Sequence, residues 1–236
     1  ASTITDSSAD VAKRALGVET FGDVRVSHLR ELASLTEFTA VYTHLGHRAE
    51  YVSMAKLEGK FEARWLPLGV WRSLLLIGDT GAGMVGGAGG ARGAPVWRGQ
   101  RFVKATRITD AWGDNLYRNT NGGQEMRGQG FFVEYDVPSG IDGMHGVALL
   151  DYGSHGGNGW SLTSAVRGEI RCFHENLCIG LSGFWFTGGV RNGMPYVLFR
   201  AGADSRSTAK RSQKEKDRRK RKRKKTDGKV LDEKEL

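Results

Sequence analysis

The sequence predicts a β-rich α+β fold, in which one or two N-terminal helices precede a single domain of short antiparallel strands rich in glycine and aromatic residues. Thirty-four glycines against four prolines indicate many tight turns, and ten Phe, six Trp and six Tyr favour strands. A length of 236 residues with 39% hydrophobic side chains is sufficient for one folded core. The alternative architecture is a β-sandwich of the jelly-roll type.

The helices are expected before residue 40. Residues 1–9 are small and polar, which predicts a flexible N-terminus. Asp10 is a suitable N-cap for a short helix that ends at Gly17. Between Ser27 and Phe38 the apolar residues recur every three or four positions, which predicts an amphipathic helix capped by Ser27.

After Thr39 the apolar spacing falls toward two, which is typical of strands, and Val41 is the first such position. Further strands are predicted at 61–65, 70–77, 96–108, 131–137, 146–152 and 195–199. Segment 111–130 is polar and rich in Gly and Asn, so it is predicted to be a long loop. The globular domain is therefore expected to span residues 10–202.

Residues 203–236 form a polybasic tail that carries the charge of the protein. Its basic run has twelve Lys and Arg against Glu215 and Asp217, a net charge of +10, whereas the whole chain sums to +9. The rest of the chain is thus nearly neutral. The basic residues are Lys210, Arg211, Lys214, Lys216, Arg218, Arg219, Lys220, Arg221, Lys222, Arg223, Lys224 and Lys225. Such a run binds phosphates by displacing counterions, so nucleic acid is the expected partner, with a nuclear localisation signal or a solvated tail as the alternatives.

A second candidate contact lies on the body of the protein. Aromatic and cationic side chains alternate along segment 96–108, a pattern typical of a groove for single-stranded nucleic acid. A half-buried strand with basic residues on its solvent face has the same pattern. The residues are Trp97, Arg98, Arg101, Phe102, Lys104 and Arg107.

Evidence for an enzyme is weak, and the sequence favours a binding protein without a cofactor. The Gly-rich segment Gly78–Gly93 has no P-loop lysine, and a surface loop is the preferred interpretation. Cys172, His174 and Cys178, with His155 as a fourth ligand, suit zinc chemically but not in spacing, so no metal site is predicted. Ser154 and His155 have no orienting third group at a readable spacing.

The segment LLDYGSHGGNGWSLTSAVRGEIRCFHENLC resembles the signature of a phage- and plasmid-associated family of unknown function, and the similarity covers about residues 128–190. That signature has Ser-His-Asp-Gly in a turn and, some fifteen residues later, Arg-x-x-Cys-x-Asn. The matching residues are Ser154, His155, Gly157, Arg171 and Asn176. Gly156 replaces the expected Asp, and His174 replaces the expected Cys. The resemblance implies a mobile-element protein with an α+β core.

A rival resemblance lies nearer the N-terminus, at about residues 20–32. Thr20–Asp23 followed by Ser27–Leu32 is similar to the N-terminal segment of capsid proteins of picorna-like viruses. This resemblance implies a jelly-roll coat protein whose basic tail contacts the packaged genome. Both interpretations place the protein inside a host cell or in a virion. The expected partners are nucleic acid and further copies of the same chain, and no contact with a membrane is expected.

Overall fold

The computed structural model describes residues 8–46, 57–66, 68, 95–103, 111–119, 125–155 and 162–200. The chain divides into two units, Ala1–Arg200 and Ala201–Leu236, and all described residues belong to the first. The tail residues 210–225, the segment Gly78–Gly93, the predicted strand 70–77, and Lys104 and Arg107 lie outside the described residues.

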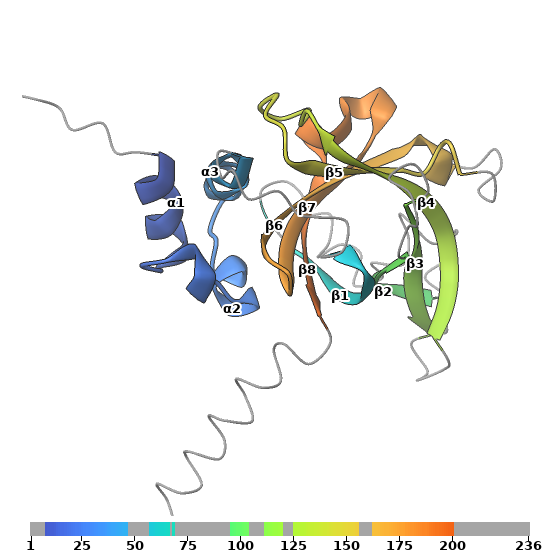
Figure 1. Cartoon of the computed structure of the whole chain (residues 1–236), viewed down its shortest axis with the longest axis horizontal. Coiled ribbons are helices and arrows are strands. Elements are labelled where there is room, and N and C mark those ends of the chain that lie inside the picture. Colours follow the sequence, from blue (N-terminus) through green and yellow to red (C-terminus); the bar gives the residue numbers. More distant parts are fainter. Residues whose placement is uncertain are drawn as a thin grey trace, which may run out of the picture. The chain divides into compact units, whose positions relative to one another are not determined.

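Eight antiparallel strands close into a barrel in which each strand pairs with the next along the chain, and β8 pairs back with β1 (Figure 1). The strands are β1 (Gly59–Trp65), β2 (Pro95–Val103), β3 (Trp112–Asn119), β4 (Glu125–Val137), β5 (Val147–Asp151), β6 (Val166–His174), β7 (Leu177–Phe184) and β8 (Met194–Arg200). The α+β prediction and its jelly-roll alternative are therefore wrong. Closure pairs both edges of the sheet, which neither predicted architecture does.

Two segments differ from their predicted secondary structure. Segment 111–130, predicted to be a loop, contains β3 and the start of β4. Two of its small or polar residues, Gly113 and Asn115, face the interior of the barrel, where space is limited: a Cβ on Gly113 would lie 2.6 Å from the ring of Phe131. Val41, predicted to be a strand residue, lies in helix α3 and is fully buried.

The N-terminal helices are α1 (Ser8–Leu16), α2 (Val26–Arg30) and α3 (Leu35–Gly46), with a short 3-10 helix at Phe21–Asp23. Gly17 follows α1 with a positive φ of 62°, in agreement with the predicted end of that helix. The predicted helix from Ser27 to Phe38 is two helices, because the chain leaves the helical path after Arg30. The helices lie beside β6, β7 and β8 (Figure 1).

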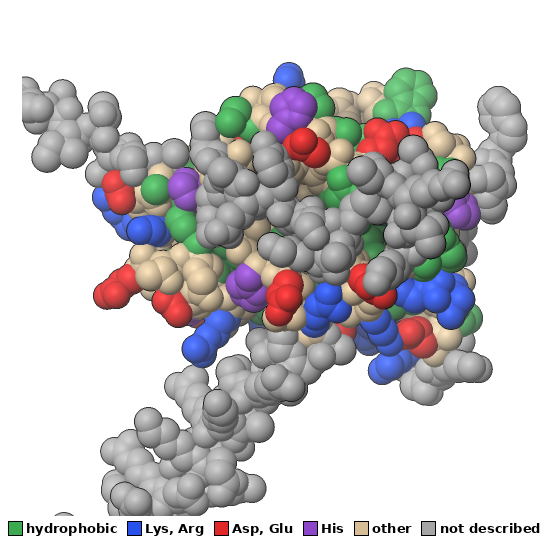
Figure 2. Space-filling view, viewed as in Figure 1, with side chains coloured by type: hydrophobic (Ala, Val, Ile, Leu, Met, Phe, Trp, Pro, Cys, Tyr) green, Lys and Arg blue, Asp and Glu red, His purple; other side chains and the backbone are tan. Residues whose placement is uncertain are grey.

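Successive side chains of a strand point to opposite faces of the sheet, and this alternation produces two hydrophobic cores. The outward side chains of β6–β8, such as Phe173, Ile179 and Val197, pack with residues of the helices. The inward side chains of the strands, among them Phe61, Phe131 and Leu198, fill the barrel. Strands β6–β8 are thus buried on both faces, whereas the outer faces of other strands carry interspersed acidic and basic side chains (Figure 2).

A polar cluster joins the helical layer to the barrel wall. Arg171 on β6 is 1% exposed and donates hydrogen bonds to the backbone oxygen of Tyr42 on α3 at 2.9 Å and to the carboxylate of Asp142 at 2.6 and 2.9 Å. The neighbouring carboxylate of Glu169 accepts from the hydroxyls of Tyr42 at 3.1 Å and Ser139 at 2.7 Å. These contacts pair charges that would otherwise be costly to bury.

Candidate ligand-binding cavity

One end of the barrel contains a cavity of about 40 Å³ that opens toward solvent. It lies where β1, β5 and β7 end and where β2, β6 and β8 begin, and the middle of β3 contributes Asn115. Its aromatic lining consists of Trp65, Trp97, Tyr152 and Phe184, and its other lining residues are Gln100, Asn115, Val166, Ser182, Gly183 and Met194. Because a single water needs about 10–15 Å³ of such space, the cavity itself has room for about three waters, and a larger molecule would extend through its open mouth.

The aromatic side of the cavity is held in place by ring contacts. The rings of Trp65 and Trp97 lie 4.5 Å apart with a tilt of 36°. Both rings contact the buried ring of Tyr196 edge-on, at 5.6 and 5.5 Å. Gly180 makes room for that tyrosine, because a Cβ at this position would lie 2.3 Å from its ring. The two indoles therefore form a fixed apolar wall.

The polar side of the cavity centres on the side-chain oxygen of Asn115. This atom accepts hydrogen bonds from Nε1 of Trp97 at 3.1 Å, from Nε2 of Gln100 at 3.4 Å and from the hydroxyl of Tyr152 at 3.2 Å. Nε2 of Gln100 also donates to the Tyr152 hydroxyl at 3.2 Å. One amide thus fixes the orientation of three other side chains.

Two features define the electrostatics of the cavity. None of the described residues that line it carries a charged side chain. Burial raises the pKa of the Tyr152 hydroxyl, although hydrogen bonds with Asn115 and Gln100 lower it, so the phenol stays neutral at physiological pH. Gln100 is 1% exposed, and its Oε1 has no hydrogen-bond partner among the described residues.

The rim of the cavity continues into an exposed aromatic ledge, formed by Phe184, Trp185 and Phe186. Phe184 lines the cavity, and its ring stacks on that of Phe186 at 5.3 Å. Trp185 and Phe186 are 64% and 54% exposed on a 3-10 helix, Trp185–Thr187, that follows β7. Phe184 is thus half-buried, whereas Trp185 and Phe186 lie on the surface.

The predicted single-strand groove is split between the two sides of the barrel wall. Trp97 points into the cavity, and Phe102 is buried inside the barrel against Phe61 and Phe131. Arg98 is exposed, and Arg101 pairs with Asp114 and lies over the Trp112 ring. The structure therefore brings the two aromatic residues together in the interior and does not place them on one face with the arginines.

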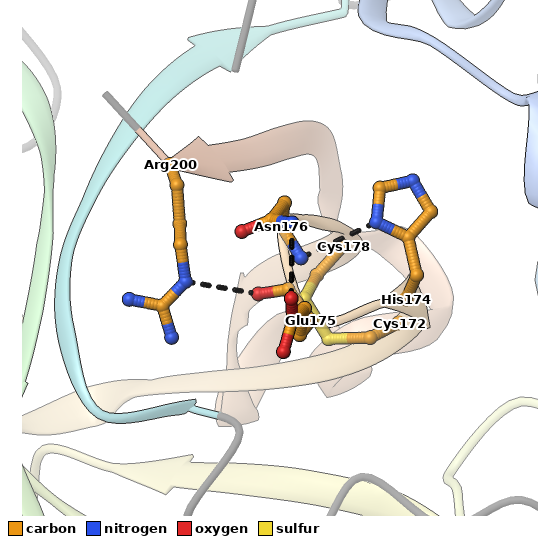
Figure 3. The surroundings of a disulfide bond; sticks show 6 residues. All are labelled: Cys172, His174, Glu175, Asn176, Cys178 and Arg200. Atoms are coloured by element: carbon orange, nitrogen blue, oxygen red, sulfur yellow. Dashed lines mark hydrogen bonds between the residues drawn. A yellow bond between two sulfur atoms is a disulfide. The ribbon is translucent and has the colours of Figure 1, made fainter. Parts of the chain in front are cut away.

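The cysteines of the rejected zinc set form a disulfide. Cys172 and Cys178 are directly opposite in the β6–β7 hairpin and are bonded to each other. The ring of His174 points away from the sulfur atoms, and its Nδ1 lies 3.3 Å from the backbone nitrogen of Asn176 (Figure 3). No group of three or more potential metal ligands occurs in the described part of the chain.

The residues of the Ser-His motif lie at the other end of β6 from the disulfide. The Ser154 hydroxyl donates to the carboxylate of Asp151, which also pairs with Arg167 at 2.6 Å. The His155 ring lies beside the rings of Phe132 and Trp112, at 5.3 and 6.5 Å. Ser154 thus bonds the aspartate directly. In a catalytic triad the serine bonds a histidine, and the histidine bonds the aspartate, so this arrangement is different.

Sequence reasoning missed Gln100, Asn115 and Tyr152 as site residues. Strict alternation from Trp97 places Gln100 on the opposite side of β2. A register shift between Trp97 and Gly99 adds one residue to the strand and returns Gln100 to the interior. Glycine after a basic residue in a strand is a weak sequence signal for such a bulge.

No family model matches the chain, and no curated protein matches it. A crystal structure of a protein from Thermomonospora curvata is similar, with 13% sequence identity and a TM-score of 0.42. The match covers 69% of this chain and 86% of that one. None of the helices in the described residues is long and apolar enough to span a bilayer.

Proposed function

We propose that the protein binds a small organic molecule in the open end of its barrel. The observation that carries this proposal is the cavity itself, which combines a fixed aromatic wall with a few convergent polar groups. Small-molecule sites are typically concave and mostly apolar, with a small number of placed polar groups, and the mouths of β-barrels are among their usual locations. Eight-stranded barrels are wide enough to hold one small ligand.

A cavity-filling variant tests this proposal. Ser182 lines the cavity, so Ser182→Phe is expected to occupy the space that a ligand needs. Thr187→Phe is the matched control, because Thr187 is exposed and does not line the cavity. Calorimetric titration with indole should show binding to the unmodified protein and to the control, and loss of binding in Ser182→Phe. Equal binding to all three proteins, or none to the unmodified protein, would refute the proposal.

Nucleic-acid binding by the tail is the second candidate function. Its support is the charge distribution: Lys210–Lys225 carries +10, and the rest of the chain sums to −1. A phage or mobile-element protein that binds phosphate through this tail fits that distribution. The coat-protein alternative was based on a jelly-roll fold, which this chain does not have. A barrel domain with a genome-binding tail is still compatible with a coat protein.

Neutralising the tail tests the second candidate. Replacing the eight consecutive basic residues at 218–225 by Gln should weaken binding to single- and double-stranded oligonucleotides alike and flatten the dependence of affinity on salt. Fluorescence anisotropy at several salt concentrations measures both effects. Unchanged affinity and slope would exclude the tail as the contact. Light scattering of the complex distinguishes a coat protein from a mobile-element binding protein, because a coat protein should form closed particles of megadalton mass.

A further inference from the structure

We infer that the ligand is an elongated, uncharged and mainly apolar molecule, with one end in the barrel cavity and the rest on the exposed aromatic ledge of Phe184, Trp185 and Phe186. This inference rests on the proposed small-molecule function and specifies the chemical class of the ligand. It depends on the size of the cavity, on the continuity of the ledge with the cavity lining, and on the contacts that hold the ledge in place.

The cavity alone encloses only the end of a typical organic ligand. Its volume of about 40 Å³ corresponds to about three waters. Three waters occupy about 90 Å³ of liquid, which is about the volume of one six-membered ring. Any larger ligand must therefore continue through the open mouth, where the nature of the rim decides which molecules are held.

The ledge continues the apolar lining of the cavity to the surface. Phe184 lines the cavity, and its ring stacks on that of Phe186 at 5.3 Å. The Phe186 ring in turn meets the Trp185 ring edge-on at 5.8 Å. No residue from 182 to 190 has a charged side chain. An ionised group on this path would lose hydration without compensation, so the bound part of the ligand is uncharged.

The outer two rings of the ledge are the most exposed large hydrophobic side chains of the described residues. Trp185 and Phe186 are both more than half exposed, whereas Val11, Met126 and Phe132, which lie on other elements, are at most 40% exposed. Single exposed apolar residues are common on protein surfaces. An adjacent pair at the mouth of an apolar cavity is typical of a binding surface.

Hydrogen bonds and a buried anchor hold the ledge in this exposed position. The Thr187 hydroxyl donates to the backbone oxygen of Phe184 at 2.9 Å, and Nδ2 of Asn192 donates to that of Thr187 at 2.6 Å. Gly188 ends the 3-10 helix with a φ of 96°. Val190, in the next turn, is buried in the core that the helices share with β6–β8. Because the rings are already ordered, binding a ligand costs less conformational entropy.

The ledge is too small to be a protein interface by itself. A buried Trp or Phe covers about 150–250 Å², so the exposed parts of Trp185 and Phe186 together offer roughly 300 Å². A stable protein–protein contact buries about 800 Å² on each partner. The ledge instead matches one further ring or a short alkyl chain. An extension of the cavity ligand therefore fits this surface better than a second copy of the chain does.

Phenol and 4-phenylphenol test the inference as a matched pair. Both are uncharged at neutral pH, and 4-phenylphenol has one additional ring in line with the first. Their hydroxyl suits the polar side of the cavity, which leaves the second ring to point outward. We expect calorimetry to give 4-phenylphenol a dissociation constant at least about tenfold lower than that of phenol, because the second ring is removed from water on the ledge.

Substitutions on the ledge locate this gain. Trp185→Ser and Phe186→Ser should each weaken binding of 4-phenylphenol by roughly three- to tenfold, the factor of one aromatic contact, and leave binding of phenol unchanged. Phe132→Ser is the matched control, because Phe132 is also an exposed aromatic residue but lies on β4 and does not line the cavity. This control should bind both compounds like the unmodified protein.

Nuclear magnetic resonance gives a second readout that needs no folded variant of low affinity. The indole N–H signal that is missing in Trp185→Ser belongs to Trp185. In the unmodified protein, this signal should shift on titration with 4-phenylphenol and stay in place on titration with phenol. The signals of Trp65 and Trp97, which line the cavity, should shift with both compounds.

The outcomes distinguish failure of the inference from failure of the proposed function. If phenol binds but 4-phenylphenol binds no more tightly, the inference is overturned and small-molecule binding stands. A gain that persists in both ledge variants, or a Trp185 signal that 4-phenylphenol does not move, has the same meaning. A dimer that Trp185→Ser dissociates, as seen by light scattering, would assign the ledge to a second copy and also overturn the inference. If indole, phenol and 4-phenylphenol all fail to bind, the proposed function itself fails.

Discussion

The side-chain oxygen of Asn115 accepts a hydrogen bond from the indole nitrogen of Trp97 at 3.1 Å, at the inner surface of the barrel cavity. This contact connects the aromatic and the polar sides of the cavity, because the same oxygen also accepts from Gln100 and Tyr152. Asn115 is 3% exposed, so water cannot easily replace it as the acceptor. The geometry of the cavity therefore depends on a single amide.

Asn115→Ala should destabilise the protein and disorder the cavity. The substitution leaves the donors of Trp97, Gln100 and Tyr152 without their shared acceptor, and unpaired buried donors together should lower the free energy of unfolding by about 2–4 kcal/mol. Urea denaturation followed by fluorescence measures this change. Asn192→Ala is the control, because Asn192 is exposed and donates to a loop carbonyl, that of Thr187. A change no larger than the control's would contradict the role given to Asn115.

The cluster at Arg171 should make stability depend on acidic pH. Burial alone would raise the pKa of Asp142, but hydrogen bonding with Arg171 and the charge of that residue hold it below the ordinary value of 3.8. A carboxyl with a lowered pKa in the folded state stabilises the protein above its unfolded pKa, and this stability is lost as pH falls through the folded value. The free energy of unfolding should therefore decrease below about pH 4.

Asp142→Asn tests this assignment. It leaves the Arg171 charge buried, so we expect a loss of about 3 kcal/mol at neutral pH and a flatter dependence of stability on acidic pH. The exposed pair of Lys60 and Glu125 provides the comparison: Glu125→Gln should change stability by no more than about 1 kcal/mol. Similar effects of the two substitutions would argue against a special role for the buried pair.

Reduction of the disulfide should lower stability without affecting the cavity. Cys172 and Cys178 are six residues apart, and opening so short a loop is expected to cost about 2 kcal/mol. The bond lies at the end of β6 opposite Val166, which lines the cavity. Thermal unfolding and indole titration of Cys172→Ala/Cys178→Ala should therefore show a lower midpoint and an unchanged dissociation constant. Loss of indole binding in a folded double variant would contradict this separation.

Tyrosine ionisation should be suppressed in the folded protein. Burial raises the pKa of Tyr117 and of Tyr135 to about 12, and it also raises those of Tyr42, Tyr152 and Tyr196. A group with a raised pKa stabilises the folded state below its unfolded pKa of 10, and this contribution is lost as pH rises toward the folded value. At pH 11, tyrosinate absorbance should be much lower for folded than for urea-unfolded protein. Equal absorbance would show that these phenols are accessible.

Local patterns predicted several elements of the fold but not its closure. Alternation identified the strands that contain Phe61, Phe131 and Val197, and the glycine at position 17 identified the end of α1. The pairing of β1 with β8 joins residues 131 to 139 positions apart, as in Trp65 with Tyr196 and Phe61 with Arg200, and no local pattern encodes it. Segment 111–130 was mispredicted because small and polar residues inside a narrow barrel have the composition of a loop.

The candidate site was harder to predict than the strands. Trp97 and Phe102 stand out in the sequence, but an aromatic residue beside a cation is compatible with either face of a strand. The register shift between Trp97 and Gly99 places Gln100 on the same, interior side of β2 as Trp97. Asn115 on β3 pairs with Gln100 and therefore lies at the same place. Such a site is assembled by register, which depends on the whole sheet.

The most direct test of ligand binding in the barrel is to follow the six tryptophan indole N–H signals by nuclear magnetic resonance during titration with indole. Single Trp→Phe variants assign the signals. The signals of Trp97 and Trp65 should shift together and saturate, while that of the distant Trp112 on the outer wall stays in place. Saturable shifts confined to Trp112 and the exposed Trp185, with Trp65 and Trp97 unchanged, would contradict a ligand site inside the barrel.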